Sequence, residues 1–140
     1  MRREEVPGFL SVLAGIREEL LSLRGRIPPE AHAFRSLPGR MTIGEQLRHV
    51  AGCDHWYLTR LWDDLPRLPR ANGVWHKLEL ERRRALDKLG NLSDAELALE
   101  RKKDHQVWTA RKLFRRFAYH ERFHHDTIER DLALFFQAQG

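Results

Sequence analysis

The sequence predicts an all-α protein, an up-and-down-type four-helix bundle with one longer crossover connection. In four separate segments, apolar residues recur every three or four positions, which is the period of a helix with one buried face. Prolines and glycines separate these segments. Because an amphipathic helix must bury its apolar face against another element, four such helices in one small chain imply a bundle. No internal repeat or change of composition is visible, so we expect residues 1–140 to form a single domain.

The helical segments are bounded by capping and helix-breaking residues. We expect helices at about residues 7–23, 42–65, 74–89 and 109–136. The second helix should begin at Thr42, because its hydroxyl can cap a free backbone amide while the Glu45 side chain reaches back. Its apolar stripe includes Leu61 and Leu65, and Pro66 follows. Short helical turns are expected at residues 30–34 and 93–97, and an extended connector at residues 102–107.

Composition and charge narrow the class of protein. The formal net charge is +5, but the basic residues occur in short groups interrupted by acidic ones. This is typical of a solvated helix surface rather than of a nucleic-acid interface. No apolar run reaches the roughly 18 residues that a membrane span needs. Cys53 is the only cysteine, and the N-terminal residues are unlike a secretory signal. Both observations favour a reducing compartment, and we expect the cytoplasm.

Two histidines occupy core-facing positions in the predicted last helix. One stripe of its helical wheel contains Leu113, Phe117, His120, His124 and Ile128. Because the two histidines are four residues apart, their rings lie one above the other and could bind one metal ion. The alternative is a pair of core histidines that form hydrogen bonds with backbone or carboxylate groups. The spacing by itself leaves both interpretations open.

Residues 120–124 also match the His-Glu-x-x-His motif of zinc proteases. These proteases need a third ligand further along the chain. Thr127 and Arg130, however, stand where the extended motif has its glycine and its last histidine. No predicted strand follows to hold a peptide substrate. The sequence therefore disfavours a zincin-type protease, and a third ligand must come from an upstream residue.

The upstream histidines that could supply the third ligand are His32, His49, His55, His76 and His105. Of these, His49 lies near the middle of a predicted helix, at a depth comparable to that of the pair on the last helix. It is about 100° from the centre of its own apolar stripe. The helical period therefore does not place it in the core.

Cys53 and Asp54 have two interpretations each. Cys53, four residues after His49, could be a metal ligand or a reactive thiol, although a lone cysteine on a helix is more often packing material. Asp54 lies in the apolar stripe, where a carboxylate needs a partner. That partner could be a metal-ligating histidine or an arginine of a neighbouring helix.

Two segments resemble the DinB/YfiT-like superfamily of metal-binding four-helix bundles. Residues 41–51, MTIGEQLRHVA, look like the capped second helix of that family with its first histidine, and an acidic residue follows five positions after it. Residues 108–124 look like its last helix, with the His-x-x-x-His spacing. The order and spacing of the elements fit over most of the chain. The resemblance implies metal ligands at His49, His120 and His124.

The resemblance also implies a class of function. Family members bind divalent ions such as nickel, zinc or iron, and those with known activity are mainly thiol-dependent transferases and isomerases. The leading hypothesis is therefore a metal-dependent transferase acting with a low-molecular-weight thiol on a small electrophile. Arg48, Asp54 or Tyr57 could orient the substrate. The alternative is a non-enzymatic metal-binding or stress-response protein, and only the net charge favours a nucleic-acid-binding bundle.

We expect a symmetric homodimer. The last helix has apolar residues beyond one stripe, namely Phe114, Phe123, Phe135 and Phe136. This is more apolar surface than one face of a bundle needs, and dimers are common in the family that the sequence resembles.

Overall fold

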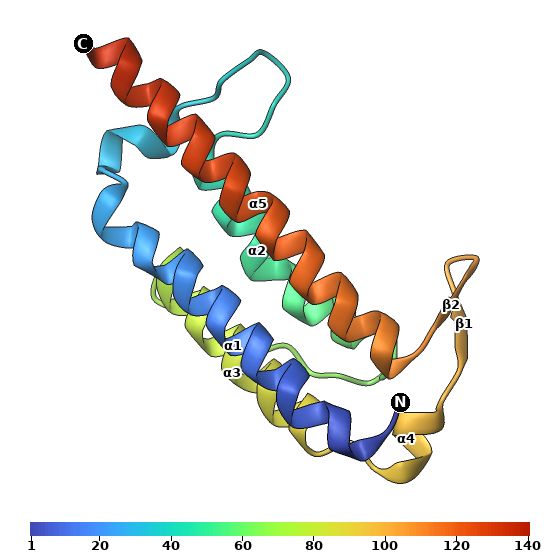
Figure 1. Ribbon diagram of the computed structural model, residues 1–140. Helices are drawn as coiled ribbons and strands as arrows, with labels where there is room; N and C mark the ends of the chain where they lie inside the picture. The colour runs from blue at the N-terminus through green and yellow to red at the C-terminus, as the bar shows by residue number, and fades with distance from the viewer.

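Helices form the frame of the computed structural model, which describes residues 1–140 (Figure 1). The helices are α1 (Val6–Ser22), α2 (Ile43–Leu58), α3 (Val74–Gly90), α4 (Asp94–Ala98) and α5 (Ala110–Gln139). Short 3-10 turns cover Arg3–Glu5, Leu23–Arg26 and Pro29–Ala33. The strands are β1 (Arg101–Lys103) and β2 (Gln106–Trp108). The all-α fold class predicted from the helical period is confirmed, and α5 extends three residues beyond the predicted end at residue 136.

Four helices, α1, α2, α3 and α5, make the bundle (Figure 1). α1 and α5 run in one direction and α2 and α3 in the other. α3 packs against α1 and α2, and α5 packs against the same two helices. Because α2 and α3 run the same way, the chain must return along the bundle between them. Residues 59–73, which we call the crossover, make this return.

The start of α2 is as predicted. The Thr42 hydroxyl accepts a hydrogen bond from the Glu45 backbone amide at 3.0 Å. In return, the Glu45 carboxylate accepts one from the Thr42 amide at 2.8 Å. This reciprocal capping box satisfies two amides that have no partner within the helix.

The prediction that α2 continues to Leu65 is wrong, since the helix ends at Leu58. The Thr59 hydroxyl and the Arg60 guanidinium both donate to the Trp56 carbonyl, at 2.6 and 3.3 Å. These side-chain hydrogen bonds use the carbonyl oxygen that would otherwise accept a hydrogen bond from a backbone amide in the next turn of the helix. The apolar residues after this point still pack against the core, which is why their spacing suggested a longer helix.

The connector at residues 102–107 is extended, as predicted, and also pairs with itself. β1 and β2 form an antiparallel hairpin in which Lys102 lies opposite Val107. Asp104 and His105 make the turn with φ values of 53° and 61°. A two-residue turn with positive φ at both positions matches the twist of the flanking strands. Neither residue is glycine, so the usual hairpin signal is absent from the sequence.

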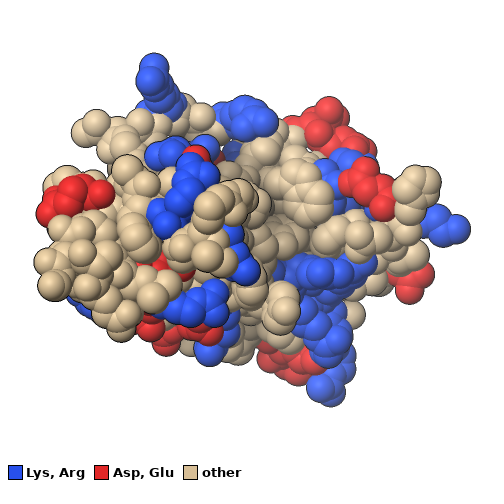
Figure 2. Space-filling view, turned by 90° about the horizontal axis from the view of Figure 1, so that it is seen from above, with Lys and Arg blue, Asp and Glu red and all other residues tan.

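A layer of charge lies inside the apolar core. Each bundle helix contributes one charged side chain to this layer, and these four, which we call the buried ion network, are Arg17, Asp54, Arg82 and Glu121. Arg17 donates to Glu121 through Nε at 2.5 Å and to Asp54 through Nη2 at 3.1 Å. Arg82 donates to Asp54 through Nε at 2.9 Å, and its Nη1 lies 3.0 Å from Glu121 Oε2. Two positive and two negative charges therefore pair with one another inside the core, whereas on the face drawn in Figure 2 basic and acidic side chains are interspersed over the surface.

Each member of the buried ion network is only 2–3% exposed. Burial alone would raise the pKa of Asp54, but the charges of Arg17 and Arg82 outweigh it and hold the pKa below its ordinary value. Asp54 is therefore a carboxylate at neutral pH. Removing one partner from such a group leaves an uncompensated buried charge, which is more costly than losing the attraction itself.

We predict that Asp54→Asn lowers the free energy of unfolding by about 3 kcal/mol or more, because both arginines lose half of their neutralising charge. Urea unfolding, followed by circular dichroism in the presence of a chelator, measures the effect. Asp64→Asn is the matched control, since Asp64 is exposed and should change stability by less than about 0.5 kcal/mol. Equal stability of the two variants would contradict a structural role for the network.

The aromatic residues of α5 divide between the core and the surface. Phe114 and Phe135 are buried, whereas Phe123 and Phe136 are about half exposed. Of the four phenylalanines whose number suggested a homodimer, only two are therefore on the surface. The homodimer stays a prediction. No helix combines the length and the apolar character needed to cross a membrane.

Candidate metal centre

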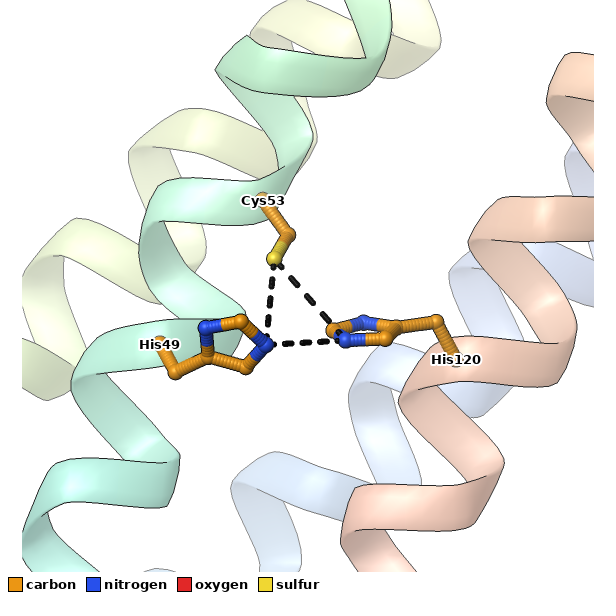
Figure 3. Close-up of side chains that lie close together, drawn as sticks. All are labelled: His49, Cys53 and His120. Atoms are coloured by element: carbon orange, nitrogen blue, oxygen red, sulfur yellow. Dashed lines mark hydrogen bonds between the residues drawn. The ribbon is translucent and has the colours of Figure 1, made fainter. Parts of the chain in front are cut away.

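α2 and α5 pack side by side and bring two pairs of donor residues together. His49 and Cys53 are four residues apart on α2, and His120 and His124 are four apart on α5, so each pair occupies one face of its helix. Nε2 of His49 lies 3.0 Å from Nε2 of His120. The Cys53 sulfur lies 3.6 Å from the first of these atoms and 3.9 Å from the second (Figure 3). Three donor atoms from two helices therefore point at one another.

These separations fit a single divalent ion. Two nitrogens bound at about 2.0–2.1 Å are about 2.9 Å apart at a right angle and about 3.4 Å apart in a tetrahedron. A sulfur bound at about 2.3 Å is then about 3.1–3.6 Å from each nitrogen. The observed 3.0 Å lies inside the first range, and 3.6 and 3.9 Å lie at or just beyond the second. His49, Cys53 and His120 thus make a donor set of suitable size and chemistry for a divalent metal.

His124 lies next to these three donor residues but is not one of the three whose donor atoms approach one another most closely. Its ring centroid is 4.6 Å from that of His120 and 4.9 Å from that of His49. Its Nδ1 lies 3.4 Å from Oε1 of Gln46, and Nε2 of Gln46 donates to Asp131 at 2.9 Å. Because Asp131 fixes the Gln46 amide, the amide oxygen faces the imidazole and favours the tautomer with hydrogen on Nδ1. The lone pair of Nε2 is then left for another partner.

Burial keeps two of the imidazoles neutral. Desolvation, and then the neighbouring His49 ring, lower the pKa of His120 to about 4. Desolvation, followed by the His120 and His49 rings, has the same effect on His124, with a pKa of about 4. Neutral imidazole is the form that binds a metal. In the same environment, burial and then the Asp54 charge raise the pKa of the Cys53 thiol to about 11, so it is not an activated nucleophile by itself.

The structure decides between the two interpretations of Asp54. Its carboxylate binds Arg17 and Arg82, so the ion pair with neighbouring helices is correct, and no bond to a histidine of the metal centre is present. Glu121, the glutamate of the His-Glu-x-x-His motif, is held by the same two arginines. A protease of that class needs this glutamate free to act as a base. The motif here therefore arises from a buried ion pair and two core-facing histidines.

The remaining histidines are His32, His55, His76, His105 and His125, and none of them joins the metal centre. His55 Nδ1 lies 2.9 Å from Arg84 Nη2. His76 Nδ1 accepts a hydrogen bond from the Asn72 amide. Of the upstream candidates left open by the sequence, only His49 reaches the pair on α5.

A cavity of about 490 Å³ opens onto the candidate metal centre. Its lining consists of Arg48, His49, Gly52, Cys53, Trp56, Tyr57 and His120. The lining combines two aromatic side chains with the three donor residues, and the cavity is large enough for a small organic molecule. Arg48 and Tyr57, two of the residues predicted to orient a substrate, lie in it, whereas Asp54 does not.

The sequence matches the family model of the DinB superfamily over residues 13–128, a range that includes both donor pairs. The chain belongs to the DinB superfamily. A solved structure of a DinB-like protein (YjoA) from Bacillus subtilis superposes with a TM-score of 0.75, covering 91% of this chain and 92% of that chain. At 13% sequence identity, this likeness shows the DinB-like fold. No similar sequence was found among curated proteins.

Gln46 and Asp131 are residues of the candidate site that the sequence did not predict. Both are polar and buried. Asp131 follows His124 by seven residues, which places it two turns along the same helix face. A carboxylate at a core-facing position of the helix that carries the histidines was therefore the signal in the sequence. Such a residue needs a buried polar partner, which here is Gln46.

We predict that Gln46→Ala weakens metal binding about 10- to 100-fold, because His124 loses the group that orients its ring. Competition with a chromophoric chelator measures the affinity, and circular dichroism checks that the bundle is retained. Gln137→Ala is the control, since Gln137 is exposed near the end of α5. Identical affinities of the two variants would exclude a positioning role for Gln46.

Proposed function

We propose that this DinB-family chain binds one divalent metal ion through His49, His120 and His124. We further propose that it acts as a metal-dependent transferase that joins a low-molecular-weight thiol to a small electrophile. The observation that supports this most directly is the approach of the His49 and His120 Nε2 atoms to 3.0 Å. The cavity beside them gives a small molecule access to the same point.

The donor chemistry supports zinc, nickel or iron as the metal. Imidazole nitrogen suits all three ions, whereas magnesium and calcium prefer oxygen donors. His124 supplies the third imidazole in this proposal, because Gln46 occupies its Nδ1 and leaves its Nε2 free. Three neutral imidazoles leave the charge of the ion uncompensated, which favours an anionic fourth ligand such as a thiolate.

His49, His120 and His124 would hold the ion, whose charge would favour the thiolate form of a small thiol near neutral pH. The thiol proton would pass to solvent, the sulfur would form a bond to an electrophilic carbon, and the bond from that carbon to the leaving atom would break with its electron pair on that atom. Trp56 and Tyr57 wall the cavity in which the two molecules would meet. Their part is to bind apolar surface and to exclude water from the reacting carbon.

The position of Cys53 favours one other function, that of a non-enzymatic metal-binding protein. Three imidazoles and one cysteine sulfur would complete a tetrahedral zinc site of the closed, structural kind. Such a site has no position for an exogenous thiol. The two functions therefore differ in whether the Cys53 sulfur, 3.6 Å from His49 Nε2, is a permanent ligand.

We predict that the protein, purified without a chelator or a histidine tag, contains about one divalent ion per chain. His49→Ala, His120→Ala and His124→Ala should each weaken binding at least ~10-fold, since a lost ligand costs no less than a lost supporting contact. His76→Ala and His105→Ala are the controls. Elemental analysis after dialysis measures the metal. If His120→Ala and His124→Ala both keep it, the proposed centre does not exist.

We predict that the metal-loaded protein consumes a small thiol in the presence of an alkyl halide or an epoxide, and that His120→Ala removes this activity. Loss of free thiol measures the reaction. Cys53→Ser should keep both the metal and the activity, because three imidazoles suffice in the transferase. Metal binding without thiol consumption, combined with metal loss in Cys53→Ser, would instead establish the non-enzymatic alternative.

A further inference from the structure

A second cavity, of about 570 Å³, lies between the crossover and the bundle. Residues 67–71 of the crossover form one wall, and residues of α2 and α3 form the other. We call it the crossover pocket. It is separate from the donor atoms of the metal centre, and the function proposed above does not use it.

Four cationic side chains line the crossover pocket, namely Arg48 from α2, Arg67 and Arg70 from the crossover, and Lys77 from α3. None of the four forms an ion pair or a side-chain hydrogen bond within the protein. The one acidic residue of the lining, Glu81, is paired with Arg84 at 3.0 Å. The pocket therefore has an excess of positive charge that no group of the chain neutralises, and an anion would relieve the repulsion.

The start of α3 adds to this positive potential. Gly73 and Val74 line the pocket, and Gly73, with a φ of 89°, caps the helix without a side-chain hydrogen bond. The first-turn amides of a 17-residue helix and the positive end of its dipole thus lie at the pocket. The four cationic side chains and the free amides at the start of α3 therefore favour the same kind of ligand, one with negatively charged oxygens.

The wall formed by the crossover is tied to the bundle. The Arg84 guanidinium donates to the Pro66 carbonyl and to Glu81, and lies 2.9 Å from His55 Nδ1. Arg84 of α3 therefore connects the crossover to α2. The two prolines at positions 66 and 69 further restrict the backbone of this wall.

Arg48 lines both the crossover pocket and the cavity of the metal centre. We propose that the crossover pocket binds the carboxylate or phosphate groups of a small acidic molecule whose other end reaches the metal centre past Arg48. The second half of this statement rests on the proposed function. The first half, an anion site between the crossover and α3, does not depend on a metal.

The pocket is tested first without metal. Calorimetry at low salt should detect binding of succinate and of inorganic phosphate to the chelator-treated protein. Arg67→Gln combined with Arg70→Gln should weaken both at least ~10-fold, because two charge-assisted contacts are lost. Arg122→Gln combined with Arg130→Gln is the matched control, since both residues are exposed, lie outside the pocket and change the net charge equally. No binding, or equal weakening in both double variants, would overturn the anion site.

The link to the metal centre is tested with metal-loaded protein. Mercaptosuccinate, which combines a thiol with two carboxylates, should bind at least ~10-fold more tightly than succinate or 2-mercaptoethanol. Arg67→Gln with Arg70→Gln should remove its advantage over 2-mercaptoethanol while metal content stays unchanged. Equal affinity for mercaptosuccinate and succinate would overturn the link. If the protein binds no metal at all, the proposed function is wrong. The metal-free calorimetry with succinate would still show whether the crossover pocket binds anions.

Discussion

Arg17, Asp54, Arg82 and Glu121 are buried together, and their mutual neutralisation is the constraint on which the arrangement of the four helices depends. A charge in an apolar core is tolerated only when a partner of opposite sign is in contact with it. Each helix supplies one charge, so no helix can slide or rotate without leaving its neighbours unpaired. Apolar packing alone does not impose this, because a leucine accepts many neighbours of similar size.

The buried ion network also determines where the candidate metal centre lies. Asp54 follows Cys53 directly, and Glu121 follows His120, and successive residues on a helix point about 100° apart. When the two carboxylates turn into the core between the arginines, the cysteine and the histidine must face the gap between α2 and α5. Gln46 and Asp131 make a second buried polar contact further along the same two helices, with His124 as the group that is held. The donor atoms are thus positioned by polar contacts that themselves lie in the core.

The helical period and the breaking residues were enough to predict the four long helices and the placement of His120 and His124 on one inward face of the last helix. They were misleading where side chains compete with the backbone, as at Thr59 and Arg60, which end α2 although the apolar spacing continues. His49 could not be placed from its own helix, because its position depends on the angle at which α5 crosses α2. The closeness of Cys53 and the support from Gln46 depend on the same angle. Contacts between two helices depend on how the helices pack, and the apolar periodicity of one helix does not predict them.

The crossover differs from the rest of the chain in what its residues contribute. None of residues 62–73 is buried, although they form one wall of the cationic pocket. Doubling the length of a flexible loop costs only about 0.6 kcal/mol of closure entropy. Insertions among the exposed residues of this segment therefore cost the bundle little stability while they reshape the wall. Ligand preference in this architecture can diverge between related proteins almost independently of folding, and the crossover is the place where a new specificity could be engineered.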